Sequence, residues 1–223
     1  MKLLVSDYDG TLNPDKDNLW KLDLNLHTVD EFREENHFMI ATGRTFKSIK
    51  EEIKKYNIGY DYLSCNDGAV LFDKNDNILF YHKIEREILL PMTAELHELK
   101  NVKNIYLYGP YDEELYYDNI CELFVRSKTL GNSNIKRIVS KYPVVLDHFG
   151  YFNYIKSFTS KALSVEFVSY QNDYSDIITV GDGRNDLDML LEYDGYKLIS
   201  SDPELYFKGL KNTLSVKTLI KKL

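Results

Sequence analysis

Short apolar runs that end in polar residues constrain the fold of this chain most strongly. Leu3-Leu4-Val5 leads into Asp7, the run 38–41 leads into Thr42, and the run 177–180 leads into Gly181. Runs of this length are typical of buried strands, and stretches with a helical apolar period lie between them. Strands that alternate with helices predict βαβ units. We therefore expect an α/β fold built on a mostly parallel sheet.

The same patterns predict the individual elements. Thr28 and Glu31 have the capping-box spacing of a helix start, and we expect the polar stretch 13–25 to be irregular. The mixed stretch 111–157 predicts short strands with one helix near 118–129. The simplest domain organisation is a core at 1–81 and 158–223, with a small α+β unit inserted at 82–157. The other expected strands are 2–6, 38–41, 62–65, 70–72, 78–81, 105–108, 177–180 and 196–199, and the other expected helices are 28–35, 45–56, 85–99, 160–170, 187–192 and 215–223.

Composition and charge exclude several classes of protein. The chain has 223 residues, 43% of them hydrophobic, and a net charge of −7, which argues against nucleic-acid binding. It contains no apolar run long enough to span a membrane, and its N-terminus reaches Asp7 too early for a signal peptide. The two cysteines, Cys65 and Cys121, do not form a metal-binding cluster. We expect a cytoplasmic protein, a monomer or weak homodimer, that binds neither nucleic acid nor membrane.

Two carboxylates follow the first predicted strand. Asp7 and Asp9 stand at its end, ahead of Gly10. Mg²⁺ prefers hard oxygen ligands, so Asp7, Asp182 and the backbone carbonyl of Asp9 are candidate metal ligands. Asp7 could attack phosphorus, and Asp9 could act as the acid and base. Taken alone, an Asp-x-Asp pair is also compatible with a turn or a helix cap.

Polar residues at other predicted strand ends extend this site. Ligands of open α/β sheets bind beyond the carboxyl ends of the strands, so these chain-distant residues should share one edge. The segment 42–44 offers Thr42, Gly43 and Arg44 for phosphate, and Thr42 could equally cap the next helix. Asn66, in the segment 66–69, is a further candidate for substrate binding, although that segment could be a plain turn.

Two later segments supply a cation and more polar groups. Lys161 stands at a predicted helix start, where a cation is unfavourable unless an anion shares the site; otherwise it is a surface lysine. The segment 181–186 contains two glycines, which allow a sharp turn, together with two acids and an amide. In it Asp182 could bind metal, Asn185 could donate to phosphate, and Asp186 could orient Lys161. An acidic β-turn is the alternative.

These four motifs, in this order, resemble the haloacid-dehalogenase superfamily, and within it the Cof-type sugar-phosphatase branch. Asp-x-Asp-Gly-Thr matches 7–11, Thr-Gly-Arg matches 42–44, the third motif is Lys161, and Gly-Asp-x-x-Asn-Asp matches 181–186. The resemblance implies a Rossmann-like core with an inserted cap, which 82–157 would form. It also implies Mg²⁺ and an aspartyl-phosphate on Asp7, with Asp9 as acid/base and with Thr42 and Lys161 on phosphate.

The expected function is Mg²⁺-dependent hydrolysis of a small phosphorylated metabolite, a sugar phosphate. Two alternatives use the same residues. A phosphomutase would pass the phosphoryl group from Asp7 to a sugar hydroxyl instead of water, and a non-catalytic regulator would only sense a phosphorylated ligand.

Overall fold

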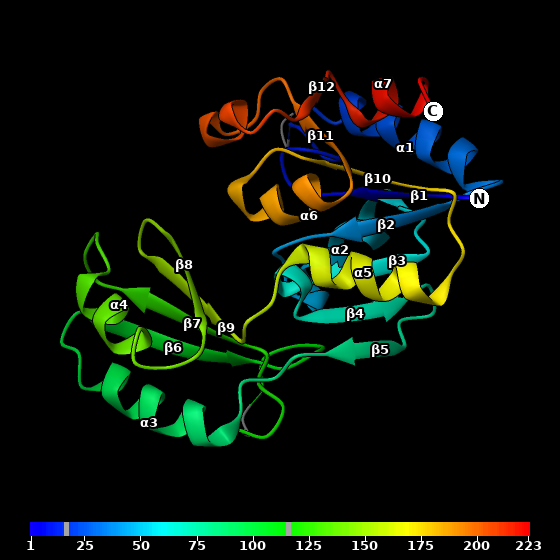
Figure 1. Cartoon of the computed structure of the whole chain (residues 1–223). Helices are drawn as coiled ribbons and strands as arrows, with labels where there is room; N and C mark the ends of the chain where they lie inside the picture. Colours follow the sequence, from blue (N-terminus) through cyan, green and yellow to red (C-terminus); the bar gives the residue numbers. More distant parts are fainter. Residues whose placement is uncertain (16–17, 115–116) are drawn as a thin grey trace.

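The computed structural model describes residues 1–15, 18–114 and 117–223, and its core is the expected α/β sheet (Figure 1). The described residues form one eight-stranded sheet in the order β12-β11-β10-β1-β2-β3-β4-β5. Six of these strands, from β12 to β3 in this order, run parallel to one another, and β4 pairs antiparallel with both β3 and β5. The strands are β1 (Lys2–Ser6), β2 (His37–Ala41), β3 (Tyr62–Cys65), β4 (Val70–Asp73), β5 (Ile78–Tyr81), β10 (Asp176–Gly181), β11 (Asp194–Leu198) and β12 (Lys211–Thr213).

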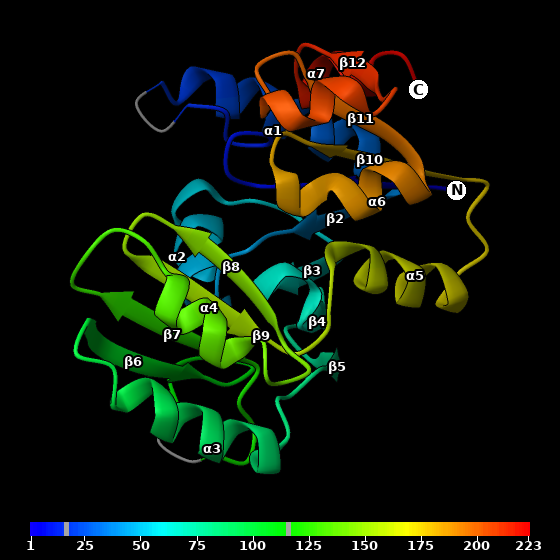
Figure 2. The same ribbon diagram turned by 60° about the vertical axis from the view of Figure 1, so that its left-hand side comes forward.

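Helices cover both faces of this sheet (Figure 2). Leu4 belongs to a hydrophobic cluster with α1 (Trp20–Arg33), α2 (Phe46–Tyr56) and α7 (Val216–Ile220). Its neighbours Leu3 and Val5 belong to the opposite cluster, with α5 (Lys161–Gln171) and α6 (Leu187–Glu192). Successive strand side chains point to opposite faces, so an unbroken apolar run suits a strand buried on both sides. Three short 3₁₀ turns complete the core: η1 (Asn66–Gly68), η2 (Arg184–Asp186) and η3 (Pro203–Phe207).

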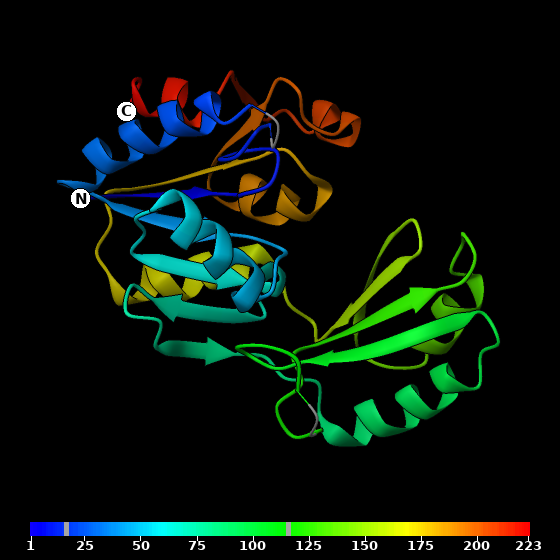
Figure 3. The same ribbon diagram turned by 180° about the vertical axis from the view of Figure 1, so that it is seen from behind.

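The segment between β5 and α5 builds a second sheet with its own hydrophobic cluster. Its strand order is β6-β7-β9-β8, all antiparallel, and it stands off one end of the core strands (Figure 3). We call this segment, residues 82–157, the insert; its treatment as a separate domain stays a prediction. Its elements are α3 (Arg86–His97), β6 (Val102–Tyr108), β7 (Glu122–Ser127), α4 (Ser133–Val139), β8 (Val145–Phe149) and β9 (Phe152–Lys156).

Two expectations about helices were wrong. Helix α1 begins at Trp20, not at Thr28, so much of the stretch expected to be irregular is helical; the part at residues 16–17 lies outside the described residues. Thr28 is inside α1, where its hydroxyl donates to the carbonyl of Leu24 one turn earlier. The helix expected near 118–129 is strand β7, in which Leu123 and Val125 are buried while Arg126 is exposed, the period of two that marks a strand.

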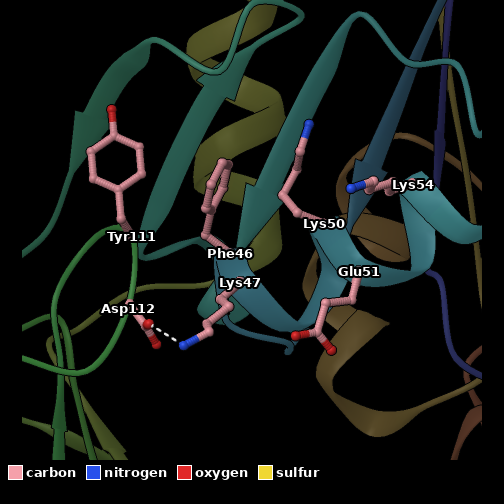
Figure 4. A pocket seen from close by; sticks show the side chains of 7 residues that line it. All are labelled: Phe46, Lys47, Lys50, Glu51, Lys54, Tyr111 and Asp112. Atoms are coloured by element: carbon pink, nitrogen blue, oxygen red, sulfur yellow. Dashed lines mark hydrogen bonds and ion pairs between the residues drawn. The ribbon is translucent and has the colours of Figure 1, made fainter.

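The insert touches the core beside α2 (Figure 4). Lys47 of α2 forms an ion pair of 2.6 Å with Asp112, and Tyr111 packs edge-on against Phe46 with ring centroids 5.2 Å apart. A shallow groove of about 340 Å³ lies here, lined by Phe46, Lys47, Lys50, Glu51, Lys54, Tyr111 and Asp112. None of the predicted site residues lines it, so this groove is separate from the candidate site.

Within the described parts of the chain, no helix combines the length and the apolar character needed to cross a bilayer. Cys65 and Cys121 are both buried and free.

Candidate active site

Asp7 and Lys161, 154 residues apart in the chain, form a buried ion pair at the carboxyl end of β1. The ammonium of Lys161 lies 2.6 Å from Oδ1 of Asp7 and 2.6 Å from Oδ1 of Asp186. Lys161 has no exposed surface, although it opens helix α5. Burial alone would lower the pKa of Lys161, but Asp186 and Asp7 outweigh it and hold this pKa above its ordinary value. Lys161 is therefore a buried cation, and the surface-lysine alternative is wrong.

Asp186 positions Lys161 through its own backbone partners. Its Oδ2 accepts from the N–H groups of Asp182 (3.0 Å) and Gly183 (2.8 Å). These bonds close the turn after β10 and fix the carboxylate beside the lysine. The structure thus brings Asp186 to the place where the sequence predicted an orienting residue.

Asp182 faces Asp7 across the strand ends. Thr11 donates to Oδ1 of Asp182 at 2.6 Å. Gly10 has a φ of +85°, and a Cβ on it would lie 2.2 Å from Oδ2 of Asp182. The turn after β1 therefore requires glycine, both for its left-handed backbone and for the close approach of this carboxylate.

The three carboxylates offer a set of hard oxygen ligands. Asp7, Asp182 and Asp186 each have an oxygen within 4.8 Å of the others. Burial raises the pKa of Asp7, and the nearby acids add to this, while Lys161 acts in the opposite direction. Burial likewise raises the pKa of Asp182. Lys161 compensates only part of this negative charge, so the residues present fit a divalent cation such as Mg²⁺, for which Asp7 and Asp182 stay the predicted carboxylate ligands.

Asp9 lies apart from this acidic group. Its two oxygens accept from Nε and Nη2 of Arg44, at 2.6 and 2.8 Å. Arg44 also lies over the ring of Tyr8 and 3.6 Å from Glu52. Asp9 raises the pKa of Arg44, as a bidentate pair should. Arg44, which the sequence offered for phosphate, thus pairs with an acid in this structure. A phosphate contact of Arg44 and a metal contact through the carbonyl of Asp9 stay predictions.

Thr42 directly follows β2, beside this pair. The residue is buried, and its hydroxyl accepts from the N–H of Arg44 at 3.2 Å. Helix α2 begins only at Phe46, with Thr45 at the N-cap position, so Thr42 does not cap that helix. A Cβ on Gly43 would lie 3.0 Å from the carboxylate of Asp67, which brings the segment 42–44 against the η1 loop.

The η1 loop after β3 holds two left-handed residues in a row, Asn66 (φ 51°) and Asp67 (φ 52°). Asn66 is fully buried, and neither polar atom of its amide makes a hydrogen bond to a described residue. Gly68, with a φ of +92°, lets this loop lie against the start of α5, because a Cβ there would overlap the carbonyl of Ser160 at 2.0 Å. This close contact fixes the loop next to Lys161.

Asn185 reaches the same loop. Its amide donates to Oδ1 of Asp67 at 2.8 Å, so in this conformation it binds a carboxylate. Contact of Asn185 with phosphate stays a prediction.

Sequence reasoning assigned no role to three charged residues at this edge. Asp67 lies in the segment 66–69, but its sequence did not indicate a role for Asp67 separate from that of its neighbour Asn66. Lys156 ends strand β9 and Glu122 begins strand β7, both in the insert, and each is 2% exposed. A pair formed between two distant segments leaves no local pattern, so only the folded chain shows that Lys156 meets Asp67 at 2.5 Å.

Comparison with known proteins agrees with this architecture. The sequence model of the haloacid dehalogenase-like hydrolases matches residues 4–140, which include the first two motifs but not Lys161 or the segment 181–186. An uncharacterized protein of Mycoplasma capricolum is 30% identical over 118 residues. That alignment covers 52% of this chain and 44% of the relative, so less than half of the relative's length is matched.

Solved structures share the whole fold at low sequence identity. A protein of Thermotoga maritima superposes with a TM-score of 0.83 at 17% identity, over 99% of this chain and 97% of that one. A haloacid dehalogenase-like hydrolase from Bacteroides thetaiotaomicron gives 0.80 at 15%, over 99% and 98%. A HAD/Cof-like hydrolase from Plasmodium vivax gives 0.81 at 18%, over 100% and 95%. The family model and the fold confirm the predicted resemblance, and the chain belongs to the haloacid dehalogenase-like hydrolases.

Proposed function

We propose that this protein is a Mg²⁺-dependent phosphatase that hydrolyses a small phosphorylated metabolite, a sugar phosphate, through an aspartyl-phosphate on Asp7. The observation that carries the proposal is the meeting of Asp7, Asp182 and Lys161 at one edge of the sheet. A subclass IIB sugar phosphatase has the same fold, with a TM-score of 0.75 at 14% identity. Free Cys65 and Cys121 suit the reducing cytoplasm.

Binding of the phosphate would use the donors around Asp7. Lys161 and the hydroxyl of Thr42 hold phosphate oxygens, and Gly43, Arg44, Asn66 and Asn185 complete the surroundings. Bound Mg²⁺, held by Asp7, Asp182 and the carbonyl of Asp9, would neutralise charge between the nucleophile and the phosphate. Asp186 keeps Lys161 in place through the 2.6 Å contact between them.

The chemistry then has two steps. In the first, a carboxylate oxygen of Asp7 attacks phosphorus, the bond to the leaving oxygen breaks, and Asp9 gives that oxygen its proton. In the second, Asp9 takes a proton from water, the water oxygen attacks phosphorus, and phosphate leaves with Asp7 restored. Because a protonated Asp9 holds Arg44 less strongly than its carboxylate does, this role requires the Asp9–Arg44 pair to loosen during turnover.

The test is phosphate release from p-nitrophenyl phosphate by the purified chain. We expect turnover with Mg²⁺, its loss with a chelator, and its loss in Asp7→Asn. No release from this compound or from a panel of phosphorylated metabolites would refute the proposal. Transfer to a sugar hydroxyl in the presence of a bisphosphate activator would instead identify a mutase.

A further inference from the structure

Lys156 is a buried cation that the insert places against the candidate active site. It ends β9 and is 2% exposed. Its ammonium lies 2.5 Å from Oδ2 of Asp67 in the core and 2.9 Å from Oδ2 of Asp147 on the neighbouring strand β8. Burying an unpaired ammonium is strongly destabilising, so these two contacts are needed for Lys156 to be buried where the insert meets the core.

Asp67, the core partner, stands among the groups expected to receive phosphate. Its other oxygen accepts from Asn185, and its carboxylate lies against Gly43. Lys156 and Lys161 together hold the pKa of Asp67 below its ordinary value despite its burial. An ionised carboxylate here would repel a phosphate dianion unless a cation compensates it. Lys161 is already shared between Asp7 and Asp186.

We propose that Lys156 is a positioning residue of the phosphate site: it neutralises Asp67, so that Asn185 stays oriented and an anion can bind beside it. This role rests on the proposed function. It makes the insert a contributor of charge to the site, through a residue that does not itself touch the substrate. Pairing with Asp147 alone does not explain why Lys156 is buried. The carboxylate of Asp147 is 52% exposed and could pair with a lysine at the surface.

The experiment measures binding of inorganic phosphate in the presence of Mg²⁺ by calorimetry, and its inhibition constant against p-nitrophenyl phosphate. In Lys156→Met the uncompensated Asp67 should weaken phosphate binding by about tenfold or more. The double variant Asp67→Asn/Lys156→Met should regain affinity to within about threefold of wild type, because the core partner of Lys156 is then uncharged and its other partner, Asp147, is 52% exposed to water. Lys141→Met, which removes the exposed partner of Glu95 in the same insert, is the matched control and should bind normally.

The outcomes separate this role from a purely structural one. A structural lysine would leave the double variant as weak as the single one, and that result overturns the proposal. If Lys156→Met does not fold, Asp67→Asn decides: it should bind phosphate at least as tightly as wild type, and a tenfold loss overturns the proposal. A wild-type protein that neither binds phosphate nor hydrolyses an aryl phosphate would refute the proposed function as well, whereas an active wild type with an unaffected Lys156→Met refutes only this role.

Discussion

The ammonium of Lys161 lies 2.6 Å from Oδ1 of Asp7, with both residues shielded from solvent. One oxygen of the candidate nucleophile is therefore held by a buried cation. Asp186 holds the lysine from the other side. Asp186 therefore acts on the candidate nucleophile through Lys161.

Replacing Asp7 with Asn should abolish turnover without unfolding the protein. The amide has the same shape but cannot form the acyl phosphate, so kcat should fall by about 10³-fold or more. Phosphate release measures the loss, and circular dichroism checks the fold. Activity within a few-fold of wild type would reject Asp7 as the nucleophile.

Mg²⁺ should stabilise the folded protein. A cation between Asp7 and Asp182 offsets the cost of burying their charges and the repulsion from nearby acids, the two effects that raise the pKa of both groups. At 100 times its dissociation constant it should add about 2.7 kcal/mol to the free energy of unfolding. Thermal unfolding with and without Mg²⁺ measures this, and Asp182→Asn should lose most of the shift. An equal shift in that variant would place the metal elsewhere.

Removing the charge of Lys161 should destabilise the fold. Lys161→Met leaves Asp7 and Asp186 buried without their cation, which should cost about 3–5 kcal/mol. Urea unfolding compares this variant with Lys54→Met, a lysine replaced on the exposed side of α2. If both variants lose the same stability, the ion pairs of Lys161 contribute nothing to folding.

Arg44 should matter for catalysis through its hold on Asp9. Arg44→Gln removes the bidentate pair that orients this carboxylate, and kcat should fall by about tenfold or more. Arg44→Lys keeps the charge but makes a single contact, so its kcat should lie between those of wild type and Arg44→Gln. Turnover of an alkyl phosphate is the sensitive measurement, because its poor leaving group needs a proton. A wild-type rate in Arg44→Gln would show that the pair has no catalytic role.

Glu122 should make stability depend on pH. Burial raises its pKa from about 4.5 to about 7, with Lys156 acting against this shift. A carboxyl with a raised folded-state pKa stabilises the fold when protonated, and this contribution is lost as pH rises from about 4.5 through 7. As pH rises from 4.5 to 8, the free energy of unfolding of Glu122→Gln should therefore increase by about 1–3 kcal/mol relative to that of wild type. Urea unfolding at both values measures it, and a pH-independent difference would contradict the assignment.

The edge of the sheet was predictable because parallel strands are aligned. Ser6 pairs with Val180 on one side and with Ile40 on the other. Whatever follows these three positions must meet, so Asp7, Asp182 and Thr42 share one edge. Apolar runs alone locate such strands, and the polar residues after them then define the site.

Other features depend on tertiary structure. Helix α1 was missed over its first two turns because its apolar residues there, Leu22, Leu24 and Leu26, do not follow a helical period. The fold buries both Leu22 and Asn25 on that helix, and the amide of Asn25 donates to the carbonyl of Leu12. The Asp67–Lys156 pair joins two distant segments, and no local period could indicate it.

The strand order has a consequence for synthesis on the ribosome. Of the strands of the core sheet β1 comes first in the chain, yet one of its two neighbours, β10, emerges only after the whole insert. A nascent chain that stops at residue 157 carries Asp7 but neither Lys161 nor Asp182, and its central strand has one open side. The early segments can therefore complete the sheet and the candidate active site only when the residues that follow the insert have emerged.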